Sequence, residues 1–167
     1  MLVTGEDLSY IAGVIDSDGY IGLVKQAEHR RKNGLTYGFK PTVVITQAQN
    51  DAITFINNIF PGGYRVLENP RKKSNWKNLY YWGIHRRELV RNFLCMILPY
   101  LKIKRKQAEL IIQFCEIRER VLSDRSRLDK KGRPRRSSKY TYSGIERELW
   151  LQIKQLNQTG VGTCQSV

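Results

Sequence analysis

A chain of 167 residues is long enough to bury a sizeable core in one domain. Its 29 Lys and Arg against 15 Asp and Glu leave a formal net charge of +14, which points to a polyanionic partner, with nucleic acid the leading candidate. The three cysteines have no paired or metal-type spacing, which argues against a disulfide framework or a zinc site. We find neither an apolar run of membrane-spanning length nor a leader-like start, so we expect a soluble, intracellular protein with no membrane partner. Composition leaves open whether its compartment is an organelle (chloroplast or mitochondrion) or a microbial cytoplasm.

The predicted elements begin with a helix. Apolar residues recur at helical spacing over residues 6–15. Residues 20–26 and 40–47 are strand-like and flank a basic, glycine-containing turn, so they predict a long hairpin. A second helical pattern begins after Asn50 and is broken by Pro61. The first third of the chain therefore predicts a helix, two strands and a helix.

A second hairpin and further helices follow. Residues 64–67 and 79–84 are strand-like and are joined by a polar, basic stretch. Helical patterns then occupy 90–97 and 108–122, and a last one opens at Ser143 with capping-box spacing. Two hairpins in one chain can form a four-stranded antiparallel sheet with helices on one face and the other face free. We therefore predict an α+β fold.

Two segments stand apart from this pattern. Residues 125–139 hold eight Lys or Arg, one acid and no hydrophobic period, which predicts a loop or arm. The end of the chain is polar, so we assign residues 1–157 to a single domain and 158–167 to a C-terminal tail.

Two carboxylates, Asp16 and Asp18, lie at the predicted C-terminal end of the first helix. The partial negative charge there disfavours a carboxylate by roughly 0.3–1 kcal/mol, so two of them need compensation. A divalent cation that prefers hard oxygen ligands would supply it. Alternatively, both are turn residues ahead of Gly19, a common role for aspartate. Their spacing alone leaves both interpretations open.

The nonapeptide around these acids, Ile-Ala-Gly-Val-Ile-Asp-Ser-Asp-Gly, resembles the motif that names the LAGLIDADG homing endonucleases. The identical positions are Ala12, Gly13, Ile15, Asp16, Asp18 and Gly19. Gln47 ends the second predicted strand, where single-motif members of this family carry an active-site glutamine. Residues 99–108 are similar to the segment that presents a catalytic lysine, which would be Lys104.

The resemblance implies an αββαββα homing endonuclease fold in which the sheet forms a DNA-binding saddle. It also implies site-specific hydrolysis of double-stranded DNA with Mg²⁺ or Mn²⁺, leaving short 3′ overhangs. Asp18 would be the essential metal ligand, with a backbone carbonyl near Ser17 completing the shell. Gln47 would orient water, Lys104 would stabilise developing charge, and Asp16 would brace the turn.

One position departs from the family. Members often carry a basic residue shortly after the glutamine, where this chain has Asp51. Arg86 or Arg87 is the expected substitute for that cation.

The motif occurs once, and single-motif members resemble homodimers, so we expect a twofold dimer on a long pseudo-palindromic target. In this family the motif helices pack against each other at the centre of the molecule. The dimer interface is predicted to comprise Ile11, Ala12, Gly13 and Ile15.

The free face of the sheet is expected to enter the major groove, where base edges are distinguishable. Strand alternation predicts which side chains face outward, although a one-residue register error would invert every assignment. The outward residues predicted to contact DNA are Gln26, Glu28, Lys40, Thr42, Tyr81 and His85, with Arg30 at the hairpin tip. Phosphate contacts are predicted for the loop cations Arg71, Lys72 and Lys139.

Two alternatives remain open at the level of sequence. One is a non-cleaving nucleic-acid-binding protein of the same fold, either an RNA maturase with intron RNA as partner or a transcription regulator. The other is a basic ribosomal-type RNA-binding protein, which leaves the acidic motif unexplained. Retention of Asp18, Gln47 and Lys104 favours a nuclease, because a pure binder does not need them. The lack of a paired His-Asn signature argues against the ββα-metal nucleases.

Overall fold

The protein was analysed as a computed structural model that describes most of the chain. The described residues are 3–26, 29–31, 34–36, 38–67, 78–123 and 144–158. The elements are α1 (Gly5–Asp18), β1 (Gly19–Lys25), β2 (His29–Arg31), β3 (Gly34–Thr36), β4 (Phe39–Gln47), α2 (Asp51–Ile59), β5 (Arg65–Leu67), β6 (Leu79–Ile84), α3 (Arg87–Ile97), the 3₁₀ turn η1 (Leu98–Tyr100), α4 (Arg105–Ser123) and α6 (Gly144–Gln158). This order confirms the predicted α+β fold.

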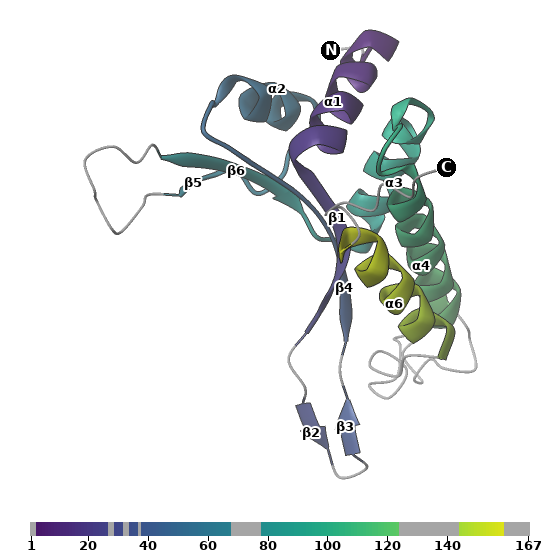
Figure 1. The fold of residues 1–167 in the computed structure, drawn as a ribbon. Helices are drawn as coiled ribbons and strands as arrows, with labels where there is room; N and C mark the ends of the chain where they lie inside the picture. Colours follow the sequence, from purple (N-terminus) through teal and green to yellow (C-terminus); the bar gives the residue numbers. More distant parts are fainter. Residues whose placement is uncertain are drawn as a thin grey trace, which may run out of the picture.

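The main sheet has the strand order β1-β4-β6-β5, and each neighbouring pair is antiparallel. Its longest hairpin joins β1 to β4, in the register Gly19↔Ile45 to Lys25↔Phe39. The short ribbon β2-β3 continues this hairpin away from the helices (Figure 1). Part of the segment that was predicted as a basic turn therefore forms two further paired strands.

One face of the sheet packs against helices, with α1, α3, α4 and α6 gathered on that side (Figure 1). The inward side chains of three strands are at most 5% exposed, which confirms the predicted alternation. They are Ile21, Leu23, Val43, Ile45, Trp82 and Ile84. The core therefore lies between this face and the helices. None of the described helices is long and apolar enough to cross a membrane.

Helix α1 begins in a capping box. The Thr4 hydroxyl accepts a hydrogen bond from the Asp7 amide (3.2 Å), and the Asp7 carboxylate accepts one from the Thr4 amide (2.9 Å). The helix passes directly into β1 at Gly19, where an added Cβ would lie 2.7 Å from the Ile15 carbonyl oxygen. Only glycine fits this abrupt change of direction, which places Asp16 and Asp18, in the last turn of α1, beside the start of β1.

Candidate active site

Asp18 and Gln47 meet at the junction of α1 with the sheet. Gln47 Nε2 donates a 2.7 Å hydrogen bond to Asp18 Oδ2. The register explains the contact, because Gly19 pairs with Ile45 and so the end of β4 runs past the end of α1. Asp18 is exposed, so its carboxylate is accessible from outside the chain. Two residues 29 positions apart thus form one polar group.

Asp16 lies in the last turn of α1 and turns toward the start of α4. Its carboxylate accepts hydrogen bonds from the backbone amides of Lys102 (2.7 Å), Ile103 (3.1 Å) and Lys104 (2.8 Å). Charge-assisted bonds of this kind are among the stronger ones in proteins. Asp16 therefore ties α4 to α1 as the expected brace, and it is turned away from the Asp18–Gln47 pair.

The Lys104 ammonium lies against the C-terminus of α1. Nζ donates to the carbonyl oxygens of Ile15 (2.8 Å), Gly19 (2.6 Å) and Ser17 (3.4 Å). Partial burial lowers the pKa of Lys104 from its usual value, while the Asp16 and Asp18 carboxylates act in the opposite direction. A lysine within the chain thus provides part of the compensation that the sequence argument assigned to a bound cation.

We expect Lys104→Met to lower the free energy of unfolding by about 1–2 kcal/mol, because an uncharged side chain leaves the carbonyls at the helix end unpaired. Lys102→Met is the matched control, since Lys102 is exposed two residues away. Urea denaturation of the two variants would measure the difference. Equal stabilities would contradict a structural role for the Lys104 ammonium.

The described part of one chain offers few ligands for a divalent metal. It contains no group of three or more His, Cys, Asp or Glu side chains that could hold a metal ion. The exposed Asp18 carboxylate is a suitable hard oxygen donor, but the carbonyl of Ser17 already lies near the Lys104 ammonium. A hard cation bound at Asp18 would therefore need further oxygen ligands, from water, from a DNA phosphate or from a second copy of the chain.

The expected substitution of the missing cation by Arg86 or Arg87 is wrong. Trp82 and Gly19 both pair with Ile45, so the start of β1, beside Asp18, is level with Trp82. Arg86 and Arg87 lie four and five residues further along, about 13–16 Å from that level. Asp51 lies in the first turn of α2 and is exposed.

The predicted dimer interface needs correction. Ile11, Ala12 and Ile15 are 0% exposed because they face the chain's own core. To contact a second copy, these side chains would have to leave the core. Exposing one buried isoleucine costs about 1.5–3 kcal/mol, so we do not assign them to an interface. Gly13 is exposed, and a Cβ added there would meet nothing within 4 Å.

Gly13 instead belongs to a stripe of small residues on the outer face of α1, which we call the small-residue stripe: Ser9, Gly13 and Ser17. All three are exposed and lie four residues apart, on one side of the helix. The two hydroxyls donate to carbonyls of their own helix, Ser9 to Gly5 (2.9 Å) and Ser17 to Val14 (3.1 Å). The side chains of the stripe are therefore short, and both of its hydroxyls already have a hydrogen-bond acceptor.

The outer face of the sheet carries a chain of polar contacts. Tyr81 Oη lies 3.1 Å from His85 Nε2, and His85 Nδ1 lies 3.3 Å from Thr42 Oγ1. The Tyr81 side chain crosses the space above Gly83, where a Cβ would collide with its hydroxyl. Arg65 lies over the Tyr81 ring at 5.1 Å. The register Arg65↔Tyr81 would have revealed this pair, but sequence reasoning missed it because it considered Arg65 only as part of a strand.

The structure distinguishes among the residues predicted to contact DNA. Gln26 is exposed, and Lys40, Tyr81 and His85 are half-buried on the outer face. Thr42 lies on that face as predicted but is only 4% exposed, which leaves little of it for direct contact with DNA. Its hydroxyl is occupied by the Lys40 carbonyl and by His85, and it can act only through the histidine.

The remaining predicted contacts cannot be placed. Glu28, Arg71, Lys72 and Lys139 lie outside the described residues. Arg30 lies in β2, but its side chain is not among those described. The predicted arm over residues 125–139 also lies outside the described part.

His85 should make stability pH-dependent. Burial lowers its pKa below the ordinary 6.5, and Lys40 and Arg65 lower it further. Between pH 6.5 and the lowered pKa, the unfolded state holds a proton that the folded state does not. The free energy of unfolding should therefore fall as the pH drops through this window. Urea denaturation at pH 7.5 and pH 5 should show that the free energy of unfolding falls less in His85→Gln than in the wild-type protein. Identical falls in the two proteins would contradict the assignment to His85.

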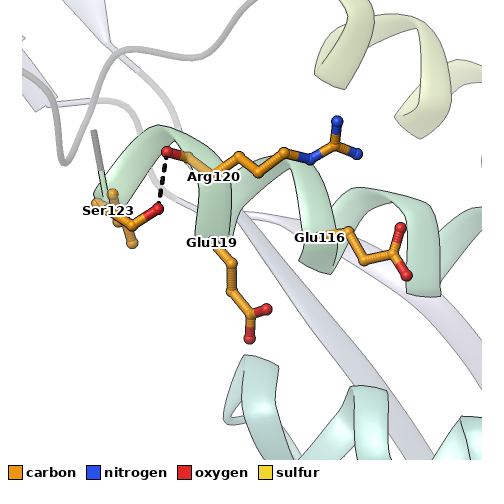
Figure 2. Close-up of a pocket in the computed structure, with 5 residues that line it drawn as sticks. Glu116, Glu119, Arg120 and Ser123 are labelled. Atoms are coloured by element: carbon orange, nitrogen blue, oxygen red, sulfur yellow. Dashed lines mark hydrogen bonds between the residues drawn. The ribbon is translucent and has the colours of Figure 1, made fainter.

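A hollow of about 670 Å³ lies at the C-terminal end of α4, away from these residues (Figure 2). Among the described residues its lining comes from that helix, and the Ser123 hydroxyl donates to the Arg120 carbonyl at 3.1 Å. Glu119, one of its acids, is paired with Arg91. Nothing in this arrangement suggests chemistry, so the Asp18–Gln47 pair remains the candidate active site.

A scan against protein-family models finds no match, and a search of curated protein sequences finds no relative. Solved structures do match. The homing endonuclease I-CvuI, in complex with a DNA target in the presence of Mg, aligns with a TM-score of 0.62 and 18% identity, over 98% of this chain and 90% of that one. The group I intron-encoded homing endonuclease I-CeuI, complexed with DNA, has a TM-score of 0.54 and 16% identity over 75% and 62% of the chains. The LAGLIDADG homing endonuclease I-GzeII, in complex with a DNA target, has a TM-score of 0.52 and 12% identity over 91% and 44%.

Proposed function

Because this chain has the LAGLIDADG homing endonuclease fold, we propose that it is a site-specific endonuclease for double-stranded DNA. It uses a divalent metal ion, Mg²⁺ or Mn²⁺, and acts as a homodimer on a long pseudo-palindromic target, leaving short 3′ overhangs. The observation that carries the proposal is the 2.7 Å contact between Gln47 and Asp18 at the exposed end of the motif helix. Such a protein acts where DNA is held, in an organelle or a microbial cytoplasm.

The residues at this junction suit phosphodiester hydrolysis. When bound, a divalent cation shields the scissile phosphate and makes a coordinated water nucleophilic at neutral pH. Asp18 would hold the cation, and the Ser17 carbonyl oxygen, which has a second lone pair besides the one facing the Lys104 ammonium, would be a second donor. The Gln47 amide holds one Asp18 oxygen in place and leaves the carboxylate oriented outward. Lys104 places a positive charge behind the same helix end, where it offsets carboxylate repulsion and stabilises charge that develops on the phosphate.

Three features support a homodimer. Among the described residues no group of three metal-binding side chains forms within one chain, and a second copy would add its own Asp18 carboxylate as a ligand for a hard cation. The small-residue stripe allows two copies of α1 to approach closely, because interaxial distance depends on the side chains at the contact. Finally, the chain covers 90% of I-CvuI but only 44% of I-GzeII, which leaves room in the latter for a second unit of this size.

A non-cleaving nucleic-acid-binding protein of the same fold, such as an RNA maturase bound to intron RNA or a transcription regulator, is the second candidate. The observation that favours it is that the Lys104 ammonium is engaged by three carbonyls of its own chain. Asp51 also stands where a basic residue is expected. Duplex cleavage separates the two candidates.

The test is a cleavage selection on a library of randomised pseudo-palindromic DNA duplexes with Mg²⁺. We expect the cleaved duplexes to contain similar half-sites in inverted repeat, because a twofold dimer requires this symmetry. No cleavage products should form when EDTA replaces the metal. If no member of the library is cut while duplexes are still bound, the second candidate is correct. A cut site without inverted symmetry would contradict the homodimer.

A further inference from the structure

A pocket of about 420 Å³ opens at the end of the sheet opposite to Asp18. It is surrounded by residues that directly follow β1 and β6, by the first residues of β4, and by residues at the start of α3 and near the end of α4. The polar residues that line it are Gln26, Lys40, His85, Arg86, Arg87, Arg118 and one acid, Glu88. Gln26, Lys40 and His85 belong to the outer face of the sheet, so the pocket borders the surface proposed to hold DNA.

The charge in this pocket is predominantly positive. Arg118 is neutralised by Glu146 in a buried pair at 3.2 Å, with side chains only 3% and 1% exposed. That leaves Lys40, Arg86 and Arg87 against one acid, Glu88. Within the described part of the chain, none of these three cations makes an ion pair. Cations gathered around a cavity without carboxylate partners favour an anionic ligand.

Arg87 adds a second, independent observation. Its Nη1 is buried and has no hydrogen-bond partner among the described residues. Buried donors are nearly always satisfied in folded proteins, and one attached to a charge is especially unfavourable when left unpaired. The nearby positive field also shows in His85, whose pKa Lys40 helps to lower. An acceptor with negative charge would relieve both conditions.

We propose that this pocket binds one phosphate of the DNA backbone, roughly 13–20 Å along the sheet from Asp18, and so anchors the duplex at the outer end of each sheet. Arg86 and Arg87 supply the principal contacts, and a guanidinium suits a phosphate because it can donate two parallel hydrogen bonds. The amino end of α3 adds a favourable partial charge, since Arg86 at its N-cap makes no side-chain cap. This inference rests on the proposed function in requiring bound DNA, but not on cleavage.

The anchor should contribute to affinity and not to chemistry. We expect Arg86→Gln and Arg87→Gln each to weaken duplex binding on the order of tenfold at low salt. Each should also reduce the slope of log Kd against log salt concentration by about one. The single-turnover cleavage rate at saturating enzyme should stay unchanged. Arg120→Gln is the matched control, because it removes an equal charge from an exposed position outside the pocket and should leave the slope unaltered.

Fluorescence anisotropy on a mixed-sequence duplex without metal measures these slopes, and circular dichroism establishes that each variant is folded. Arg86 is exposed, so its variant keeps the test valid if Arg87→Gln unfolds. In a duplex that the protein cleaves, single phosphates can be replaced in turn by neutral methylphosphonate linkages. One position per half-site should weaken binding of the wild-type protein but not binding of the arginine variants. Unchanged slopes in both variants, or a scan without such a position, would overturn the proposal.

Inorganic phosphate distinguishes a free anion from the DNA backbone. If millimolar phosphate raises the melting temperature of wild type but not of Arg87→Gln while the DNA slopes stay equal, the pocket serves a free anion and the DNA assignment is wrong. Reduced slopes in a protein that cuts no duplex would uphold the anchor while the proposed nuclease activity fails. The two proposals can therefore fail separately.

Discussion

Asp18→Asn is expected to abolish metal-dependent cleavage while duplex binding is retained. Asparagine keeps the size of the side chain and a carbonyl oxygen that can still accept from Gln47 Nε2, so the local geometry should survive. It removes the charge that would hold a divalent cation. The loss should exceed the roughly 10–100-fold that follows removal of a group in the outer shell of a metal. Binding should be equal or tighter, because a negative charge facing phosphates is removed.

Single-turnover cleavage and anisotropy on the same duplex measure the two effects. Asp51→Asn is the matched control, since it removes one exposed carboxylate just beyond β4 and should leave cleavage intact. Asp16→Asn is not equivalent, because it would weaken three backbone hydrogen bonds at the start of α4. Cleavage by Asp18→Asn at the wild-type rate would remove this residue from the chemistry and leave the active-site assignment without its central group.

Gly13→Leu is expected to convert the protein to a monomer that remains folded. A side chain at this position meets nothing within 4 Å in its own chain, and leucine is a better helix former than glycine by up to about 1 kcal/mol. Across a twofold axis the added atoms would clash with the second copy twice, each clash costing about 1–3 kcal/mol. Dimerisation should therefore weaken at least roughly 30-fold.

Sedimentation equilibrium measures the association, and thermal unfolding establishes that the chain is still folded. Gly144→Leu is the matched control, because Gly144 is also exposed in a helix with nothing within 4 Å of an added Cβ. Cleavage should fall together with dimerisation in the first variant and stay unchanged in the second. A fully dimeric Gly13→Leu protein would place the interface elsewhere on the surface.

Much of the fold could be predicted from local pattern. The alternation that placed Ile21, Val43 and Trp82 inward was correct, because a strand has a period of two and one face of this sheet is buried. The order of elements was also correct. The ribbon β2-β3 was predicted only as a turn, since its residues are basic and carry no apolar alternation.

The candidate site was only partly predictable. Asp18, Gln47 and Lys104 were named from a family resemblance, and the structure brings all three to one helix end. What Lys104 contacts there was not predictable, because the carbonyls at the end of α1 become its partners only when the segment from η1 to the start of α4 folds back against that helix end. The same applies to Thr42, whose burial depends on a histidine 43 residues away.

The sequence by itself determined the charge, the alternating faces of the strands, and the acidic motif at a helix end. Only the tertiary structure decided which side of α1 is free. Ile11, Ala12 and Ile15 looked like an interface, yet they fill the core, and Gly13 between them is open to solvent. The physical reason is that an apolar helical face is encoded identically whether its own sheet or a second copy covers it.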